Sequence, residues 1–271
     1  MPRPILVTYK VWPTPEALAG AAAEYFAAAV TAAVEARGVA RVAISGGTTP
    51  KAMFALLADR SKPFFAQMPW ERLQLFWVDE RCVPPTDKDS NYRMTSEAML
   101  QHVPLPVSQI HRIEGELDPE VAAARYEAVI RTAFRMEGVE MPVFDLVLLG
   151  LGEDEHTASL FPYTDALNEL GRIAVANHVP QKDMWRITLT WPVINRAREV
   201  AFLIEGVTKA QAVQDVFRGA YHPEAKPAQL IQPASGRLDL LLDAAAGSLL
   251  PAPAGKETAA AGSPYVATLE I

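Results

Sequence analysis

The segment DLVLLGLGEDEHTASLFP, residues 145–162, carries the strongest indication of the fold. Its apolar run ends at two glycines one residue apart, Gly150 and Gly152, and a group of titratable side chains follows at once. A buried strand that opens through a glycine turn into polar residues is typical of an α/β enzyme, whose catalytic groups follow the carboxyl ends of the strands. We therefore take His156, within that polar group, as the first candidate for a catalytic residue.

Strand-like and helix-like segments take turns along most of the chain. Thr14 and Pro15 fit the N-cap and first turn of a long Ala-rich helix that should end near Gly38, and Thr208 fits the N-cap of a later helix. This alternation predicts the α/β class, with a mostly parallel, Rossmann-like, doubly wound sheet covered by helices on both faces. The predicted strands are residues 5–9, 41–45, 73–78, 144–150, 172–177, 186–190 and 199–206, and the predicted helices are residues 15–38, 51–59, 121–134 and 208–219.

Composition points to a globular protein with a substantial core. The chain has 271 residues, of which 50% are hydrophobic and 21% are charged, which excludes a disordered protein. We assign residues 1–250 to a single α/β domain. Residues 251–271 are rich in Ala, Pro and Gly and lose periodicity, so we expect a loosely ordered tail, with a strand over residues 266–271 as the alternative.

Charge and cysteine content limit the classes of partner and the compartment. The formal net charge of −7 argues against nucleic acid or an anionic membrane as the main partner, because such surfaces select a basic face. Cys82 is the only cysteine, so the chain forms no internal disulfide. The first residues lack the pattern of a secretory signal, and no uninterrupted apolar run has the length of a membrane helix. We expect a cytoplasmic protein whose oligomeric state the sequence leaves open.

Two loops at predicted strand ends have the composition of anion-binding sites. In Ser45-Gly46-Gly47-Thr48, the glycines allow close backbone approach, and free amides at the start of the next helix suit a phosphate. The alternative is a tight turn capped by a threonine. In the next loop, Arg81 is suited to bind a phosphate or carboxylate, and Asp79 to hold that arginine or orient a catalytic group. Solvated surface is the alternative for these charges, and for Glu80 both interpretations stay open.

His156 and Asp154 form the candidate catalytic pair. The imidazole, with an ordinary pKa of about 6.5, accepts a proton at neutral pH, and Asp154 can fix its tautomer. A histidine that only caps or packs a helix is the alternative. The chain has neither HExxH nor CxxC, and its other histidines show no ligand spacing with His156, so we predict no metal site.

A scattered basic set completes the candidates. Lysines and arginines usually face solvent, and Lys182 is best explained in that way. Arg186 begins the predicted strand RITLT, and Lys209 lies at the start of a predicted helix, where its charge opposes the helix dipole. We therefore expect an anion beside Lys209, with the substrate as one candidate.

Several blocks of the chain resemble a known family closely. The blocks SGGTTP, FWVDERCVPPTDKDSNYRM, LLGLGEDEHTASLFP, RITLT, GVTKAQAV and SGRLDLLLDAAA are similar, in this order, to the signature of the 6-phosphogluconolactonases within the glucosamine-6-phosphate isomerase/deaminase superfamily. The resemblance covers residues 5–248. It rests on the order and spacing of all the blocks together, because SGG alone is a weak motif.

The resemblance implies hydrolysis of 6-phospho-D-glucono-1,5-lactone to 6-phosphogluconate, a step of the pentose phosphate pathway, without a required cofactor. By similarity His156 is the general base that activates water, while Asp79 and Asp154 orient the site. The phosphate is held by Arg81 and Lys209 with the loop from Ser45 to Thr48, and Arg186 adds positive charge. The implied partner is a phosphorylated sugar lactone.

One position departs from the family pattern. The family normally has glycine where this chain has Glu155. If the position requires a positive φ, a residue with a side chain stores strain there. Alternatively, the carboxylate of Glu155 leans on His156 and raises its pKa.

Two other functions remain open at this point. An amino-sugar phosphate isomerase/deaminase shares the SGG loop, but such enzymes tend to have IAFNEP after the histidine where this chain has residues 157–162, TASLFP. A non-catalytic sugar-phosphate-binding module is the other alternative, made conceivable by Glu155. Modules of that kind often carry a helix-turn-helix segment and a basic surface, and the sequence indicates neither.

Overall fold

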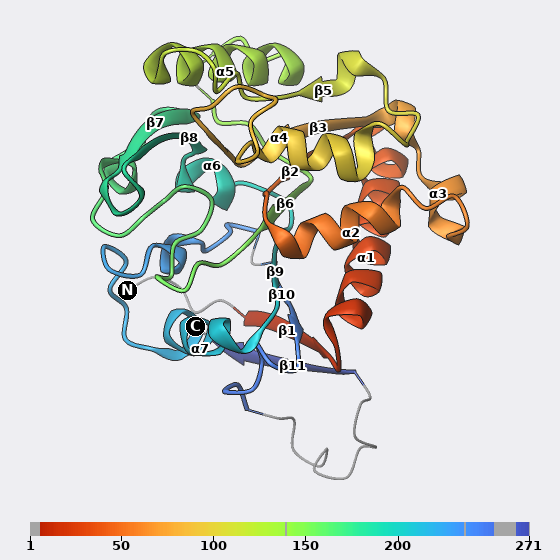
Figure 1. Ribbon diagram of the computed structural model, residues 1–271, viewed down its shortest axis with the longest axis vertical. Helices are drawn as coiled ribbons and strands as arrows, with labels where there is room; N and C mark the ends of the chain where they lie inside the picture. Colours follow the sequence, from red (N-terminus) through yellow and green to blue (C-terminus); the bar gives the residue numbers. More distant parts are fainter. Residues whose placement is uncertain (1–5, 139, 236, 252–263, 271) are drawn as a thin grey trace.

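A mostly parallel, eight-stranded sheet forms the centre of the protein (Figure 1). The computed structural model describes residues 6–138, 140–235, 237–251 and 264–270. The order across the sheet is β11-β1-β10-β9-β6-β2-β3-β5, and every neighbouring pair is parallel except β1 and β11. These strands are β1 (Leu6–Trp12), β2 (Ala40–Ile44), β3 (Leu73–Trp77), β5 (Ile110–His111), β6 (Leu146–Leu149), β9 (Val200–Ile204), β10 (Leu238–Asp243) and β11 (Tyr265–Glu270).

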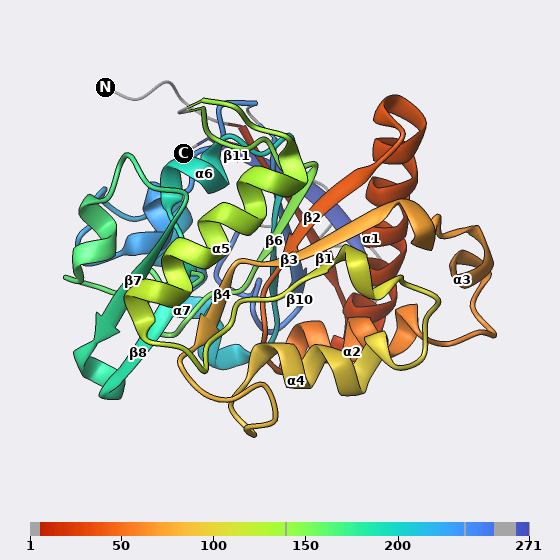
Figure 2. The ribbon, with the colours of Figure 1, turned by 90° about the horizontal axis from the view of Figure 1, so that it is seen from above.

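Helices lie on both sides of this sheet, as predicted. In Figure 2, α1 and α2 lie to one side, and α5 and α6 lie to the other. Strands covered on both faces read as continuous apolar runs, and every residue of β6, β9 and β10 is buried. The helices are α1 (Pro15–Arg37), α2 (Thr48–Leu57), α3 (Pro63–Gln67), α4 (Asn91–Thr95), α5 (Pro119–Phe134), α6 (Trp191–Asn195) and α7 (Ala210–Arg218).

Helix α1 begins and ends where the sequence predicts. The Thr14 side chain accepts a hydrogen bond from the Ala17 amide, and Gly38 ends the helix with a φ of 74°. By length and composition this 23-residue helix is apolar enough to cross a membrane, although acidic residues interrupt its apolar run. Its buried residues, among them Phe26 and Val30, belong to the main core cluster, which accounts for its apolar composition.

A second, three-stranded antiparallel sheet stands beside the first and corrects one prediction. It contains β4 (Asp79–Arg81), β7 (Ala174–Val179) and β8 (Met184–Leu189), in the order β4-β8-β7 (Figure 2). The two predicted strands near residues 172–190 exist, but they do not join the parallel sheet. A short turn that ends at Asp183, with a φ of 46°, joins β7 to β8, and a parallel pair would need a much longer crossover.

The end of the chain also differs from the prediction. Residues Tyr265–Glu270 form β11, which runs antiparallel to β1 from Leu6↔Glu270 to Val11↔Tyr265. The expectation of a loosely ordered tail is wrong for these residues, and the alternative of a terminal strand is confirmed for them. Their side chains alternate between partly buried and exposed, as expected of an edge strand. Residues 252–263 and 271 lie outside the described part.

Tyr126 of α5 completes the backbone hydrogen bonding at the end of β3, where β3 extends beyond the neighbouring strand β5. Strand β5 pairs only with Leu75 and Phe76, so the next residue, Trp77, lies beyond its reach. The Tyr126 hydroxyl accepts a hydrogen bond from the Trp77 amide at 2.9 Å and donates one to the Trp77 carbonyl at 2.6 Å. This contact fixes the end of β3, directly before Asp79.

We expect the substitution Tyr126→Phe to lower the free energy of unfolding by about 1–3 kcal/mol, because it leaves a buried amide and carbonyl without partners. Chemical denaturation measures this loss. The matched control is Tyr221→Phe, since Tyr221 is 53% exposed. Equal stability of the two variants would show that the Tyr126 hydroxyl does not anchor β3.

Candidate active site

A cavity of about 290 Å³ opens at the carboxyl ends of β2, β3 and β6. It brings together eight of the ten candidate residues. Asp154 contacts the cavity through His156, and Thr48 directly follows Gly47 in the chain. The cavity is lined by Ser45, Gly46, Gly47, Asp79, Arg81, Asn91, Gly150, Leu151, Gly152, His156, Ala158, Arg186 and Lys209.

A compact loop after β6 presents His156 to this cavity. The Gly152 amide donates to the His156 carbonyl at 2.8 Å, and the Thr157 hydroxyl donates to the Gly150 carbonyl at 2.8 Å. The loop therefore closes on itself, and the strand end holds its two ends together. These two contacts fix the backbone of His156 at the cavity.

The His156 ring is oriented by two contacts. Its Nδ1 lies 2.5 Å from Asp154 Oδ1, and the ring stacks on Phe161 with centroids 3.9 Å apart and planes 14° apart. A carboxylate only accepts hydrogen bonds, so Nδ1 carries the proton and Nε2 keeps a free lone pair. The side chain is 25% exposed, which leaves Nε2 accessible from the cavity.

Asp154 is suited to remain ionised beside this ring. Burial raises its pKa. The hydrogen bond to His156, the charge of His156 and hydrogen bonds from the backbone lower the pKa by more than burial raises it, so the net shift is downward. An ionised Asp154 stabilises the imidazolium that forms when Nε2 takes up a proton. The pair therefore has the geometry of a general base and its orienting group.

Gly152 makes room for this pair. A Cβ atom at this position would lie 2.0 Å from His156 Nδ1 and 2.3 Å from Asp154 Oδ1. Both distances are far below van der Waals contact, so any side chain would displace the pair. The hydrogen bond between Asp154 and His156 thus requires glycine at position 152 for steric reasons. Gly150 is different, because nothing lies within 4 Å of a Cβ built there.

Glu155 occupies a backbone conformation that favours glycine. Its φ is 64°, in the left-handed region, so the strain expected from its side chain is present and costs about 1–3 kcal/mol. The carbonyl of Glu155 accepts a hydrogen bond from the Ala228 amide at 3.0 Å. Burial raises the pKa of the Glu155 carboxyl, and the charges that modify this shift are those of Lys226, Asp215 and Asp154.

Asp79 is a buried organiser of the cavity wall. It is 5% exposed, and its Oδ2 accepts a hydrogen bond from the Ser159 hydroxyl at 2.6 Å and lies 3.8 Å from Arg186 Nη1. Asn91 Nδ2 donates to the Asp79 carbonyl at 3.0 Å. Asp79 therefore ties the end of β3 to the histidine loop and to β8, and the arginine that it holds is Arg186.

Glu80 does not lie on the solvated surface, which is one of the two interpretations that the sequence leaves open. It is 1% exposed, and its carboxylate accepts hydrogen bonds from the amides of Arg81, Asn91 and Tyr92 and from the Ser90 hydroxyl. Burial raises its pKa, although these amides oppose the shift. Glu80 thus anchors the start of α4, and with it the position of Asn91.

Arg81 and Arg186 lie opposite each other in the β4–β8 pairing. Arg81 Nη1 donates to the Asp89 carbonyl, while the Nε atoms of both arginines are buried without a partner. Burial chiefly lowers the pKa of Arg186, Asp79 raises it, and Arg81 lowers it again. Two neighbouring guanidinium groups with unused donors favour an anion between them.

The SGG loop leaves the start of α2 without a side-chain cap. Gly47 is the N-cap residue, with a φ of 116°, and Thr48 and Thr49 already belong to the helix. The interpretation of a threonine-capped turn is therefore wrong. Gly46 packs against Asn91, since a Cβ there would lie 1.9 Å from Asn91 Oδ1. The ten-residue helix α2 therefore begins, without a side-chain cap on its first amides, next to the cavity wall formed by Gly46 and Gly47.

Lys209 reaches the cavity from the start of α7. It is the N-cap residue of α7, behind a short 3₁₀ turn over Val207–Lys209, so the prediction that Thr208 caps this helix is wrong. The anion expected beside Lys209 is present in part, because Glu153 Oε1 lies 3.9 Å from Nζ. Glu153 is 64% exposed, and water weakens this contact.

Asn91 is a polar residue of the cavity that the sequence analysis did not predict, and the apolar residues Leu151 and Ala158 line the cavity as well. The only signal for Asn91 was its position in the polar DSNYRM loop. Lys182 lies on the exposed β7–β8 turn and not among the lining residues, in keeping with its interpretation as a surface residue. Among the described residues, no group of three or more His, Cys, Asp and Glu side chains could hold a metal ion.

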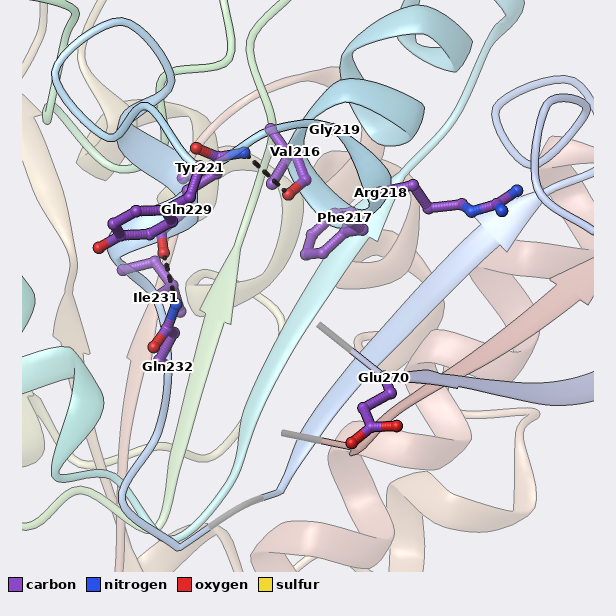
Figure 3. A pocket seen from close by; sticks show the side chains of 10 residues that line it. Val216, Phe217, Arg218, Gly219, Tyr221, Gln229, Ile231, Gln232 and Glu270 are labelled. Carbon is purple, nitrogen blue, oxygen red and sulfur yellow. Dashed lines mark hydrogen bonds between the residues drawn. The ribbon is translucent and has the colours of Figure 1, made fainter. Parts of the chain in front are cut away.

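A separate pocket of about 230 Å³ lies between α7, the segment after it and β11 (Figure 3). Its walls include Phe217 and Ile231, and Gln229 crosses it to donate hydrogen bonds to the carbonyls of Val216 and Ala220. In the described part of the chain this pocket contains no candidate catalytic residue. The chemistry of the candidates is therefore concentrated in the first cavity.

Comparisons with known proteins agree with this architecture. The family model described as glucosamine-6-phosphate isomerases/6-phosphogluconolactonase matches residues 13–240. A 6-phosphogluconolactonase of Synechocystis is 44% identical over 82% of this chain and 89% of its own length. A 6-phosphogluconolactonase of Mycobacterium tuberculosis is 37% identical over 81% of this chain and 89% of its own length.

Solved structures give the same fold. The 6-phosphogluconolactonase of Trypanosoma brucei superposes with a TM-score of 0.77 at 27% identity, covering 90% of this chain and 98% of that one. A monomeric glucosamine-6-phosphate deaminase superposes with a TM-score of 0.72 at 19% identity, covering 90% and 99% of the two chains. At that identity the deaminase supports the fold alone.

We expect Gly152→Ala to break the contact between Asp154 and His156 while leaving the protein folded, because the new methyl group would occupy the place of the two side chains. NMR of the His156 ring nitrogens reports the tautomer directly. The matched control is Gly150→Ala, where a methyl group meets nothing within 4 Å. The steric account of Gly152 is wrong if the alanine at position 152 leaves the Nδ1 proton in place.

Proposed function

The chain belongs to the glucosamine-6-phosphate isomerase/6-phosphogluconolactonase family, and on this premise we propose that it hydrolyses 6-phospho-D-glucono-1,5-lactone with His156 as the general base. The product is 6-phosphogluconate, and the reaction is a step of the pentose phosphate pathway. The single observation that carries the proposed role of His156 is its Nδ1 contact with Asp154, which leaves Nε2 free at a cavity lined by cations.

The proposed reaction follows from this geometry. Nε2 of His156 takes a proton from a water molecule, and the resulting hydroxide adds to the lactone carbonyl carbon. The bond from that carbon to the ring oxygen then breaks, and the ring oxygen receives the proton from Nε2. Asp154 stabilises the transient imidazolium through Nδ1. The reaction consumes only the lactone and water.

The far end of the substrate is proposed to lie against the cationic wall. The cavity is lined by three cationic side chains, Arg81, Arg186 and Lys209, although the whole chain has a formal net charge of −7. The unpaired Nε atoms of both arginines and the uncapped amides at Gly47 and Thr48 are donors that suit phosphate oxygens. Binding of a remote phosphate fixes the carbonyl beside the base, which converts binding energy into rate.

Asp79 has a supporting role in this proposal. It holds Arg186 and Ser159 from a buried position, so we assign it to positioning the cationic wall and the histidine loop. Ser45, 6% exposed at the end of β2, lines the same cavity and completes the substrate-binding loop.

The two other functions receive less support. An isomerase/deaminase shares the fold, but the segment after His156 is TASLFP, where such enzymes tend to have IAFNEP. A non-catalytic binding module has no use for an oriented histidine whose Nε2 is free. For the compartment we propose the cytoplasm, and for the ligand a soluble phosphorylated lactone and not nucleic acid or membrane, in keeping with the acidic composition and the single cysteine.

We expect His156→Ala to lower kcat by roughly a hundredfold to ten-thousandfold, because it removes the proton acceptor. Lactone hydrolysis is measured on freshly generated substrate, with the spontaneous rate subtracted. The exposed His178 supplies the control, His178→Ala, which should keep the parent rate. Retained turnover in His156→Ala would place the general base elsewhere.

We expect Arg81→Ala to raise KM for the phosphorylated lactone about tenfold or more, because a charge-assisted hydrogen bond contributes about 1.5–3 kcal/mol. Hydrolysis of the dephosphorylated lactone, glucono-1,5-lactone, should change little in the same variant. Lys182→Ala, which removes a surface charge, is the control. An equal loss for both lactones would contradict a phosphate-binding role, and rapid deamination of glucosamine 6-phosphate by the parent would favour the sister activity.

A further inference from the structure

A second polar cavity, of about 570 Å³, lies at the amino ends of the parallel strands, on the far side from the catalytic cavity. Most of its lining residues precede or begin β2 and β3 or precede β5, and Ala133 and Arg135 lie at the end of α5. The catalytic cavity, in contrast, lies where β2 and β3 end. The two cavities are therefore separated by the length of the strands. The second cavity is lined by Arg37, Gly38, Val39, Arg41, Glu71, Arg72, Gln74, Ser108, Gln109, Ala133 and Arg135.

Positive charge in this cavity exceeds what nearby carboxylates balance. Four arginines line it against a single glutamate, Glu71, in a chain whose formal net charge is −7. Asp145, the carboxylate behind the wall, pairs with Arg37 at 2.7 Å and also accepts from the Arg41 backbone amide at 2.8 Å. Within the described residues, no carboxylate oxygen lies within 4.0 Å of a side-chain nitrogen of Arg72 or Arg135.

The Arg41 guanidinium is held by neighbouring residues, but one of its hydrogen-bond donors, Nε–H, has no partner. Its Nη2 donates to the Ala133 carbonyl at 3.3 Å, and its guanidinium lies 4.8 Å from the centre of the Phe134 ring. Its Nε is buried without a partner. In the described part of the chain, the other buried and unpartnered arginine Nε atoms belong to Arg81 and Arg186, which both line the catalytic cavity.

The shift in the pKa of Arg41 also indicates positive charge that is not balanced within the cavity. Burial chiefly lowers this pKa, Asp145 raises it, and the neighbouring Arg135 lowers it again. Repulsion between two guanidinium groups is relieved when an anion lies between them. The cavity thus repeats the electrostatic pattern of the substrate site.

Acceptor atoms accompany these donors. Gln74 Oε1 and Gln109 Oε1 are both buried without a partner. Gln109 Nε2 donates to the Glu71 carbonyl at 2.5 Å, which fixes the amide so that Oε1 is the free atom. A buried acceptor without a partner is costly, so a ligand that fits this cavity brings hydroxyl or other donor groups as well as negative charge.

We propose that this cavity binds a small polyhydroxylated anion, a polyol that carries a phosphate or a carboxylate group. Arg41, Arg72 and Arg135 bind the anionic group, while Gln74 and Gln109 accept hydrogen bonds from hydroxyls. Guanidinium groups bind phosphate and carboxylate through the same paired donors, so both sources of the anion are tested. The proposal stands on this cavity alone and does not depend on the activity of the catalytic one.

An NMR titration of isotopically labelled protein separates the two cavities. The Gly38 amide and the Arg41 Nε–H report on the second cavity, and the Gly47 amide reports on the catalytic one. The probes are glucose 6-phosphate, gluconate, inorganic phosphate and, as a neutral polyol, sorbitol. We expect saturable shifts at Gly38 and Arg41 with glucose 6-phosphate, gluconate or both, weaker binding of inorganic phosphate and none of sorbitol.

The variant that tests the arginines is Arg72→Gln combined with Arg135→Gln. Both side chains are exposed, so the fold should survive. We expect the dissociation constant at the second cavity to rise at least about tenfold, equivalent to about 1.4 kcal/mol. The charge-matched control is Lys88→Gln combined with Lys182→Gln, two exposed lysines of which neither lines this cavity.

Several results would overturn the proposal. These are the absence of saturable shifts at Gly38 and Arg41 with both polyol anions, an unchanged dissociation constant in the arginine variant, or an equal loss in the lysine control. Binding of inorganic phosphate as tight as that of the polyol anions would overturn the role of the glutamines. Shifts confined to Gly47 would count against this proposal alone, and shifts confined to Gly38 and Arg41 would count against the proposed function alone.

Discussion

The contact between Asp154 and His156 is the interaction on which the rest of the site depends. It requires Gly152 to have no side chain, because any Cβ there would collide with both partners. It also requires the left-handed backbone at Glu155, which this chain adopts although glycine would adopt it with less strain. The loop after β6 is therefore built around one hydrogen bond, and its strain is offset by closure onto the strand end and by the contact with Ala228.

Parallel strands supply the second constraint. Because β2, β3 and β6 run in the same direction, the SGG loop, the Asp79–Arg81 strand and the histidine loop meet at one edge of the sheet. The small antiparallel sheet then places Arg186 opposite Arg81. Buried carboxylates, Asp79 and Glu80, hold this edge in shape but leave the Nε donors of both arginines unpaired. An acidic protein thus keeps a locally cationic cavity.

Much of this arrangement could be predicted from the sequence, and the exceptions have physical causes. Periodicity and caps identified α1, and strand-end motifs identified the residues that the structure brings together, because both signals are local. The pairing of β7 with β8 depends on a short turn and not on the strands themselves, and the buried state of Glu80 depends on amides that α4 brings to it. The place of Asn91 depends on its contact with the distant Gly46, which no local pattern indicates. The sequence offers a terminal strand only as the alternative to a loose tail, because β11 is stabilised by pairing with the distant β1.

The most direct measurement of the central claim is a crystal structure of the protein with 6-phosphogluconate bound. The account predicts the phosphate against Arg81, Lys209 and the Gly47 amide, and the carboxylate carbon beside Nε2 of His156, with Asp154 still on Nδ1. A product bound with its phosphate at His156, or a His156 ring turned away from the carboxylate, would contradict it.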